Sequence, residues 1–164
     1  MSKNRLIYRL FSWFLIFLSL LAFLYIFGRV NVAFGPSMEP TLYSGDRILI
    51  DRKAYEAVKP AKDDIVAFPA PRRGAFYIKR VVAEEGDEVK ITSEGVRVNS
   101  KLKKNTEGPW SYNRFTLEEN KVFVLGDNGY NSEDSREFGP VKANTIVGKV
   151  KYVIWPPSRW GFVK

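Results

Sequence analysis

One serine in this sequence lies in a setting suited to nucleophilic chemistry. Ser37 falls within the stretch Gly35–Leu42, between Pro36 and Pro40. A proline fixes its own backbone angle and restricts the residue before it, so the backbone around this serine is constrained on both sides. Such a serine is a candidate nucleophile if a base lies within reach. A proline-containing linker is the alternative, and the octapeptide alone does not separate the two interpretations.

A candidate base lies inside an apolar, strand-like run. The run Ala75–Ala83 contains two adjacent cations, Lys79 and Arg80. Side chains alternate between the faces of a strand, so both cations are solvated only if both faces are exposed. If Lys79 is the buried one, desolvation lowers its pKa and allows it to act as a neutral general base. The alternative is an edge strand on which both cations are in water.

A long polar loop supplies further candidates. The segment Gly126–Arg136 contains two serines, three carboxylates and an arginine, which together can position a lysine through hydrogen bonds and ion pairs. A calcium site is one alternative, but the acids Asp127, Glu133 and Asp134 do not recur at every second position as in an EF-hand loop. A solvated loop without chemistry is the other alternative.

The composition limits the chemistry that is available. The chain of 164 residues has no Cys and no His, which excludes disulfides, thiolate nucleophiles and the usual histidine base or zinc ligand. We therefore expect no metal and no cofactor. Four cations in residues 1–29 account for half of the formal charge of +8, which leaves +4 for residues 30–164. A charge this small argues against nucleic acid as a partner.

The N-terminal part has the pattern of a membrane anchor. Leu10–Gly28 runs for nineteen residues without a charge, enough at about 1.5 Å per residue to span roughly a ~30 Å hydrocarbon core. Three cations precede this run and only Arg29 follows closely, so the positive-inside rule places residues 1–9 in the cytoplasm and residues 29–164 outside. A cleaved signal peptide is the alternative, because Asn31–Ala33 loosely resembles a cleavage site, although this apolar run is long for one.

After this segment the chain consists of short runs rich in β-branched and aromatic residues, most of them bounded by Gly, Pro, Asp or Asn. This pattern predicts a mainly β domain, a compact barrel or sandwich, without a long helix after residue 28. Ser93–Gly95 is a candidate tight turn, and Lys53–Val58 gives a weak helical signal. The predicted strands are Arg47–Asp51, Asp64–Phe68, Ala75–Ala83, Glu88–Thr92, Gly95–Asn99, Lys121–Leu125 and Ile146–Ile154.

Four motifs follow the apolar run in a recognisable order. They are S-M-x-P-T-L from Ser37, G-D-x-I from Gly45, K-R-V-V from Lys79 and G-D-N-x-x-N-S-x-D-S-R from Gly126. Any one of them arises easily by chance, but together they resemble the membrane-bound type I signal peptidases. The resemblance implies a serine endopeptidase that removes signal peptides from secreted preproteins at Ala-x-Ala sites.

The resemblance also assigns roles to residues. It implies Ser37 as the nucleophile and Lys79 as the general base, a dyad that needs no histidine. Ser132 matches the serine that hydrogen-bonds and orients the lysine. Other positions match residues that brace the site, namely Asp127, Asp134 and Arg136, and residues that line pockets for small side chains, namely Met38, Leu42 and Ile78.

The oxyanion hole departs from one branch of the family. The enteric members have a serine two residues before the nucleophile, where this chain has Gly35, and Pro36 has no N–H to donate. The Ser37 N–H is then one donor, and a second would come from the Gly35 backbone or from water. Loss of one donor costs about 3–4 kcal/mol of transition-state stabilisation, so we expect a replacement.

Anchor and resemblance together predict a single-pass monomer of the cell membrane, with signal peptides and the lipid bilayer as partners. Only 45 residues separate Arg80 from Gly126, an interval where larger relatives have an extra β subdomain. We expect little more here than a hairpin and a loop around Gly108–Trp110. The aromatic stretch Trp155–Phe162 either docks at the membrane interface or closes the β core.

Three other functions remain open. The self-cleaving repressors of the SOS response use the same Ser-Lys logic but need no membrane segment. Conjugative pilin-processing peptidases differ in substrate more than in chemistry. A membrane-tethered β domain that only binds a partner would give Lys79 no chemical role and would tolerate its replacement.

Overall fold

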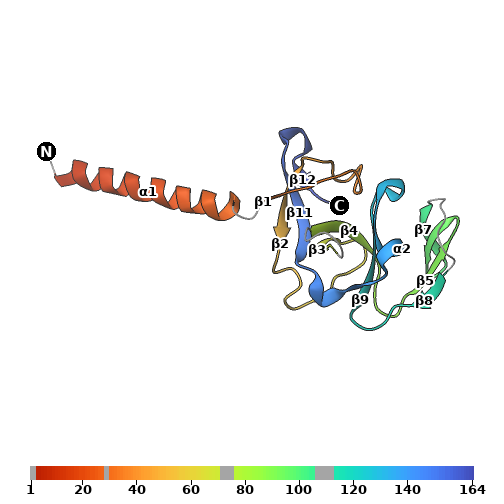
Figure 1. The fold of residues 1–164 in the computed structure, drawn as a ribbon. Coiled ribbons are helices and arrows are strands. Elements are labelled where there is room, and N and C mark those ends of the chain that lie inside the picture. Colours follow the sequence, from red (N-terminus) through yellow and green to blue (C-terminus); the bar gives the residue numbers. More distant parts are fainter. Residues whose placement is uncertain (1–2, 28–29, 71–75, 106–112) are drawn as a thin grey trace. The chain divides into compact units, whose positions relative to one another are not determined.

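The chain divides into two compact units, Met1–Val30 and Asn31–Lys164. The computed structural model describes residues 3–27, 30–70, 76–105 and 113–164. Most of the regular structure in the second unit consists of short β-strands (Figure 1). The prediction of a mainly β fold after the N-terminal segment is therefore confirmed.

The first unit is a single helix, α1 (Lys3–Phe27). It covers all of the predicted apolar segment except Gly28, which lies outside the described residues. The large apolar side chains between Ile7 and Leu21 are exposed in this structure. Among the described residues, no helix reaches the combination of length and hydropathy that a membrane crossing requires. The membrane anchor stays a prediction.

The second unit contains a large sheet that carries the candidate site. Its strands are β1 (Val30–Val32), β2 (Arg47–Asp51), β3 (Ile65–Pro69), β4 (Phe76–Ala83), β9 (Lys121–Leu125), β10 (Val141–Lys142), β11 (Gly148–Trp155) and β12 (Gly161–Phe162). They lie in the order β1-β2-β11-β3-β4-β9-β10, and β12 also pairs with β11 (Figure 1). Strand β4 therefore has neighbours on both sides, β3 and β9.

A smaller sheet is inserted between β4 and β9 in the chain. Its strands are β5 (Glu88–Thr92), β6 (Gly95–Val98), β7 (Lys101–Asn105) and β8 (Asn113–Thr116), in the order β7-β6-β5-β8. The predicted tight turn joins β5 to β6, with Thr92 opposite Gly95. The expectation of little more than a hairpin is wrong, because two polar strands flank that hairpin. The expected loop at Gly108–Trp110 lies outside the described residues.

The apolar core has several parts that connect the elements around the site. Residues of β4 and β9, including Val82 and Phe123, pack with Val89 and Val96 of the smaller sheet. A second cluster joins the segment that contains Ser37 to β2, β3 and β11. Neither sheet closes on itself in the described part of the chain, so of the two predicted architectures, barrel or sandwich, a closed barrel does not form. The ends of the large sheet are the very short strands β1 and β10, which do not meet.

Among the described residues of the second unit, helical structure is limited to single turns. Lys53–Val58, the weak helical candidate, forms turns and a bend instead of a helix. One of the single turns, α2 (Ser135–Phe138), begins within the polar loop and is capped by the Asp134 side chain, which accepts a bond from the Arg136 N–H. The turns are η1 (Gly129–Asn131), α2 (Ser135–Phe138), η2 (Ala143–Thr145) and η3 (Pro157–Arg159).

Candidate active site

Ser37 lies in the connection between β1 and β2, a segment held by backbone hydrogen bonds. At its base the Ala33 N–H donates to the Asp46 carbonyl (2.9 Å), and the Gly45 N–H donates to the Ala33 carbonyl (2.8 Å). The Ser37 carbonyl in turn accepts a bond from the Asn128 N–H of the polar loop (2.9 Å). We define residues 33–46 as the nucleophile loop. The backbone of Ser37 is thus held by bonds within this loop and by a bond from the polar loop.

Lys79 reaches this serine from the middle of β4. Its Nζ donates to the Ser37 Oγ at 2.8 Å, and the lysine is only 4% exposed. The alternative in which both cations are in water is therefore wrong, because Lys79 is buried. Burial lowers the pKa of Lys79 to about 8, since desolvation outweighs the attraction of Asp134 and Glu133. At pH 7 about one lysine in ten is then neutral.

The aromatic ring of Tyr77 flanks the same amine. The Lys79 Nζ lies 5.4 Å from the centroid of this ring. The Tyr77 hydroxyl donates to a carboxylate oxygen of Glu133 at 2.7 Å, which ties the polar loop to β4. Neither residue was among the predicted site residues. Tyr77 shares a strand face with Lys79, and this spacing is the signal that could have identified it.

Ser132 lies beside the nucleophile, but it does not make the expected bond. Its Oγ is buried and has no hydrogen-bond partner among the described residues. The bond from Ser132 to the lysine that the resemblance implies is therefore absent here, and the Lys79 amine donates to Ser37 instead. A methyl group added at Gly126 would lie 2.2 Å from the Ser132 Oγ and 2.5 Å from the Ser37 carbonyl oxygen. Only glycine allows this close approach.

Asp134 and Arg136 form an ion pair whose two side chains are completely buried, with 2.8 Å between Nε and Oδ1. Asp134 also accepts a bond from the Gly126 N–H at 3.0 Å, and Arg136 donates to the Gly129 carbonyl at 2.8 Å. These contacts close the polar loop on itself. The bracing role of the pair stays a prediction.

Asp127 contacts Arg80 and not the lysine beside it. Both carboxylate oxygens accept bonds from Arg80, at 2.8 Å from Nε and 2.7 Å from Nη2. The Thr41 hydroxyl donates to the same carboxylate at 2.5 Å. Asp127 therefore joins three segments: the nucleophile loop, strand β4 and the polar loop. Arg80 and Thr41 were missed as site residues, although both lie inside the motifs.

The acids of the polar loop are used by arginines and a tyrosine. Asp127 pairs with Arg80, Asp134 with Arg136, and Glu133 accepts the Tyr77 hydroxyl. Within the described ranges no three acidic side chains gather as a metal site. The calcium interpretation of this loop has no support in the geometry.

The predicted pocket residues come together in one apolar cluster. Met38 and Leu42 are buried, at 4% and 1% exposure, and pack with residues of β2, β3 and β11. Ile78, on β4, is half-buried and packs against the same cluster. The side chains next to the nucleophile and the base therefore belong to one apolar cluster.

The expected second oxyanion donor is engaged elsewhere. The Gly35 N–H donates to the Ser44 Oγ at 3.3 Å, and Gly35 has a positive φ of 81°. The geometry therefore does not favour the Gly35 backbone as the donor. The Ser37 N–H remains as the candidate oxyanion donor within this loop.

Comparisons with known proteins identify the family of this chain. The family model for signal peptidases of peptidase family S26 matches residues 5–155. The chain belongs to this family. It is 35% identical over 158 residues to signal peptidase I of Bacillus caldolyticus, with 85% of each chain covered. This S26 protein is therefore a peptidase.

Two further relatives cover less. Thylakoidal processing peptidase 1 of Arabidopsis thaliana is 36% identical over 138 residues, which are 75% of this chain but only 41% of the plant protein. The chain thus spans less than half the length of that relative. The crystal structure of a signal peptidase I from Enterococcus faecalis matches with 28% identity and a TM-score of 0.45, covering 56% of this chain and 96% of the other.

The environment of Lys79, the predicted base, predicts how the peptidase activity of the protein depends on pH. The Glu133 carboxylate favours the ammonium form of Lys79, so Glu133→Gln should lower the pKa of the lysine further below about 8. A larger fraction of neutral lysine is then present at pH 7, and the acid limb of the kcat/KM profile should move to lower pH. Glu118→Gln, at an exposed ion pair with Lys121, is the matched control. A shift of the limb to higher pH would contradict this assignment.

The buried ion pair predicts a stability effect. Asp134→Ala leaves Arg136 buried without its carboxylate, which should reduce the free energy of unfolding by about 3–5 kcal/mol. Urea denaturation followed by tryptophan fluorescence measures the loss. Glu118→Ala breaks a pair in which the acid is 75% exposed, and should change stability by less than about 1 kcal/mol. Equal effects of the two substitutions would contradict the prediction.

Proposed function

We propose that this S26 peptidase removes signal peptides from preproteins by cleavage after Ala-x-Ala, with Ser37 as the nucleophile and Lys79 as the general base. The observation that carries the proposal is the 2.8 Å contact between the Lys79 Nζ and the Ser37 Oγ, made by a lysine that is only 4% exposed. A buried, partly neutral amine in contact with a hydroxyl is the arrangement that serine activation requires.

The reaction follows from this pair. The neutral Lys79 amine takes the Ser37 hydroxyl proton as the Oγ attacks the scissile carbonyl. The oxyanion that forms accepts a hydrogen bond from the Ser37 backbone N–H. The ammonium then gives its proton to the leaving amino group, and an acyl ester on Ser37 remains. Lys79 next takes a proton from water, whose oxygen attacks the ester. When the tetrahedral intermediate formed by this attack collapses, the Ser37 Oγ leaves and recovers the proton from Lys79, and the signal peptide is released with a free carboxylate.

Strand β4 offers an edge to an extended substrate. Its pairing with β9 stops at Arg80, opposite Leu125. The Val81 N–H donates to the Asp64 carbonyl on the β3 side, so by alternation the backbone of Ile78 points to the other side. An extended peptide can add to this edge by main-chain hydrogen bonds, as in other cases of strand addition. In this pairing the scissile bond of the substrate lies opposite Lys79 or opposite a residue next to it on β4.

The apolar surface beside the dyad accounts for the proposed sequence preference. Met38 and Leu42, next to the nucleophile, pack in one apolar cluster with Ile78, next to the base, and we expect this cluster to border the bound substrate. Because such a surface leaves room only for small side chains, alanine is favoured at the two positions that face it. Asp127, Asp134 and Arg136 support the dyad from the polar loop, and Ser132 lies beside the nucleophile.

We propose a membrane setting on the basis of the sequence and the exposed aromatics. Residues 1–9 would be cytoplasmic, residues 10–28 would be the anchor, and residues 29–164 would work outside as part of a monomer, with signal peptides and the bilayer as partners. Trp155, Trp160 and Phe162 are 51%, 65% and 76% exposed, so they do not close the β core. Aromatic side chains of this kind are enriched at membrane interfaces.

The test is cleavage of a preprotein by the full chain in detergent. The product should begin directly after Ala-x-Ala, as read by mass spectrometry of the new N-terminus. A matched preprotein with leucine in place of the last alanine should be cut at least about 100-fold more slowly, because the longer side chain does not fit. An enzyme that leaves the first substrate intact, or that cuts both equally, would contradict the proposed function.

A further inference from the structure

A C-terminal arginine contacts the nucleophile loop at a place that the proposed chemistry does not use. Arg159, the last residue of η3, donates from Nε and Nη2 to both carboxylate oxygens of Asp46, at 3.0–3.1 Å. Its Nη2 also donates to the Thr41 carbonyl at 3.0 Å. Asp46 is 2% exposed, so the bonds from Arg159 replace the water that its carboxylate has lost. One guanidinium therefore holds two points of the loop.

Further contacts hold the same part of the loop. Asp46 accepts a bond from the Tyr43 N–H at 2.9 Å, and the Arg159 guanidinium stacks 4.2 Å from the centre of the Tyr43 ring. The hydroxyl of Thr41 donates to Asp127. Thr41 is thus fixed by Arg159 through its carbonyl and by Asp127 through its side chain. It lies four residues after Ser37.

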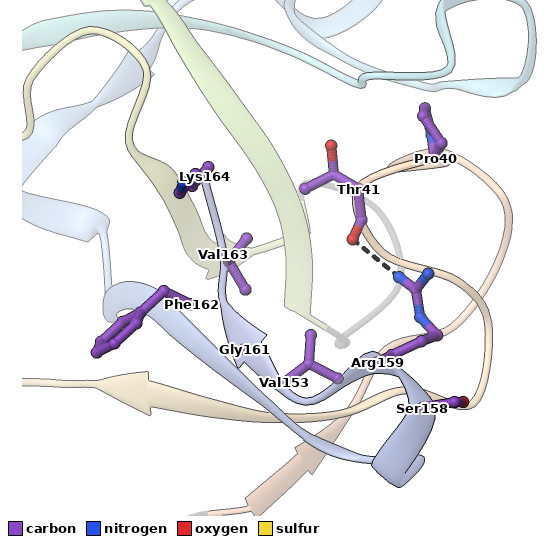
Figure 2. Close-up of a pocket in the computed structure, with 9 residues that line it drawn as sticks. All are labelled: Pro40, Thr41, Val153, Ser158, Arg159, Gly161, Phe162, Val163 and Lys164. Atoms are coloured by element: carbon purple, nitrogen blue, oxygen red, sulfur yellow. Dashed lines mark hydrogen bonds between the residues drawn. The ribbon is translucent and has the colours of Figure 1, made fainter.

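A pocket of about 350 Å³ lies beside this contact, between the nucleophile loop and the C-terminal residues (Figure 2). Pro40 and Thr41 line it on the loop side, and Phe162 and Val163 line it from the C-terminal segment. Figure 2 shows Arg159 reaching from that segment to the Thr41 carbonyl. Because open space occupies part of this interface, packing alone does not hold the loop there.

We propose that Arg159 is a positioning residue, which holds the nucleophile loop so that the Ser37 Oγ stays within hydrogen-bonding distance of Lys79. This inference rests on the proposed function. Arg159 contacts neither member of the dyad, and it acts through the backbone at Thr41 and the carboxylate of Asp46. Its loss therefore affects the placement of Ser37 and leaves the proton affinity of Lys79 unchanged.

Arg159→Ala should lower kcat by about 10- to 100-fold, because a displacement of about 1 Å between reacting groups costs up to about 10²-fold. KM should change by less than about threefold, and the acid limb of the pH profile should not move. Arg159→Lys keeps the charge but cannot reproduce the guanidinium fork, so its kcat should be intermediate. Arg114→Ala, which removes a similar bond to Glu88 in the smaller sheet, should leave kcat unchanged.

Chemical rescue separates positioning from general stability. Millimolar guanidinium ion can enter the space beside the loop, and should restore part of the kcat of Arg159→Ala without affecting Arg114→Ala. Rates are normalised to the folded fraction, which is measured by circular dichroism in the same buffer. An unchanged kcat in Arg159→Ala, or a loss that disappears after this normalisation, overturns the proposal. A loss that guanidinium does not restore and that is expressed in KM alone also overturns it.

A second measurement does not depend on the substrate. Amide hydrogen exchange over residues 37–46 should be faster in Arg159→Ala than in the wild type, and exchange over β5 and β6 should be unchanged. Equal exchange in the loop overturns the proposed positioning even if no preprotein is cut. Conversely, suppose that the exchange difference between Arg159→Ala and the wild type is observed while the wild type cuts no preprotein. That outcome contradicts the proposed function and leaves the positioning intact.

Discussion

Lys79→Met is expected to reduce cleavage of an Ala-x-Ala preprotein by about 10³- to 10⁵-fold. Methionine occupies nearly the volume of the buried lysine stem, so the substitution removes the amine and not the packing. Without the amine that lies 2.8 Å from its Oγ, Ser37 stays a neutral hydroxyl and a poor nucleophile. Ser37→Ala should have an effect of similar size, and the double variant should be no worse than either, because the two residues act as a unit.

The measurement is single-turnover cleavage at several pH values. In the wild type the rate should rise with pH and level off above an apparent pKa of about 8, because the protonated lysine cannot accept the serine proton. Lys142→Met, at an exposed position of β10, is the matched control and should retain full activity. Cleavage by Lys79→Met at the wild-type rate would exclude the dyad and favour a different base.

Gly126→Ala is the second substitution with a large expected effect. Its methyl group would lie 2.5 Å from the Ser37 carbonyl oxygen and 2.2 Å from the Ser132 Oγ, far inside van der Waals contact. The Ser37 carbonyl is held by the Asn128 N–H, and the Gly126 N–H is held by Asp134. Neither backbone can give way without moving the nucleophile. We expect at least about a 10²-fold loss of kcat, together with about 1–3 kcal/mol of stability.

Gly161→Ala is the matched control for this substitution, because a methyl group there meets no atom within 4 Å. Combining Gly126→Ala with Ser132→Gly removes one of the two clashes and should recover only part of the activity, since the contact with the Ser37 carbonyl remains. Denaturation in urea gives the folded fraction of each variant. Full activity of the single variant Gly126→Ala would show that the polar loop can shift away from Ser37 without consequence.

Local sequence patterns were sufficient for the longer strands of the large sheet, but not for its shortest strands β1, β10 and β12. Runs such as Arg47–Asp51 and Lys121–Leu125 match β2 and β9 residue for residue, because alternating or continuous apolar residues report burial directly. The polar strands β7 and β8 escaped prediction. Their residues, Lys101–Asn105 and Asn113–Thr116, form strands because neighbouring strands pair with them, and pairing is not encoded within the segment itself.

The candidate site divides in the same way. Ser37 and Lys79 could be identified from their motifs, since a serine between prolines and a lysine within an apolar strand are unusual locally. Ser132 could be placed near them, but not the orphaned state of its hydroxyl. Arg80 is the residue directly after Lys79 in the sequence. Its pairing with Asp127, 47 residues later, was nevertheless not predictable.

The sequence by itself limited the chemistry of this protein: it contains no histidine and no cysteine, and its family motifs predict Ser37 and Lys79 as the catalytic pair. Only the tertiary structure decided that Lys79 is buried and in contact with Ser37, 42 residues earlier, and that Arg159 reaches Asp46 across 113 residues. Desolvation and ion pairing depend on which groups surround a side chain in space. Those neighbours are set by the packing of the sheet and its loops.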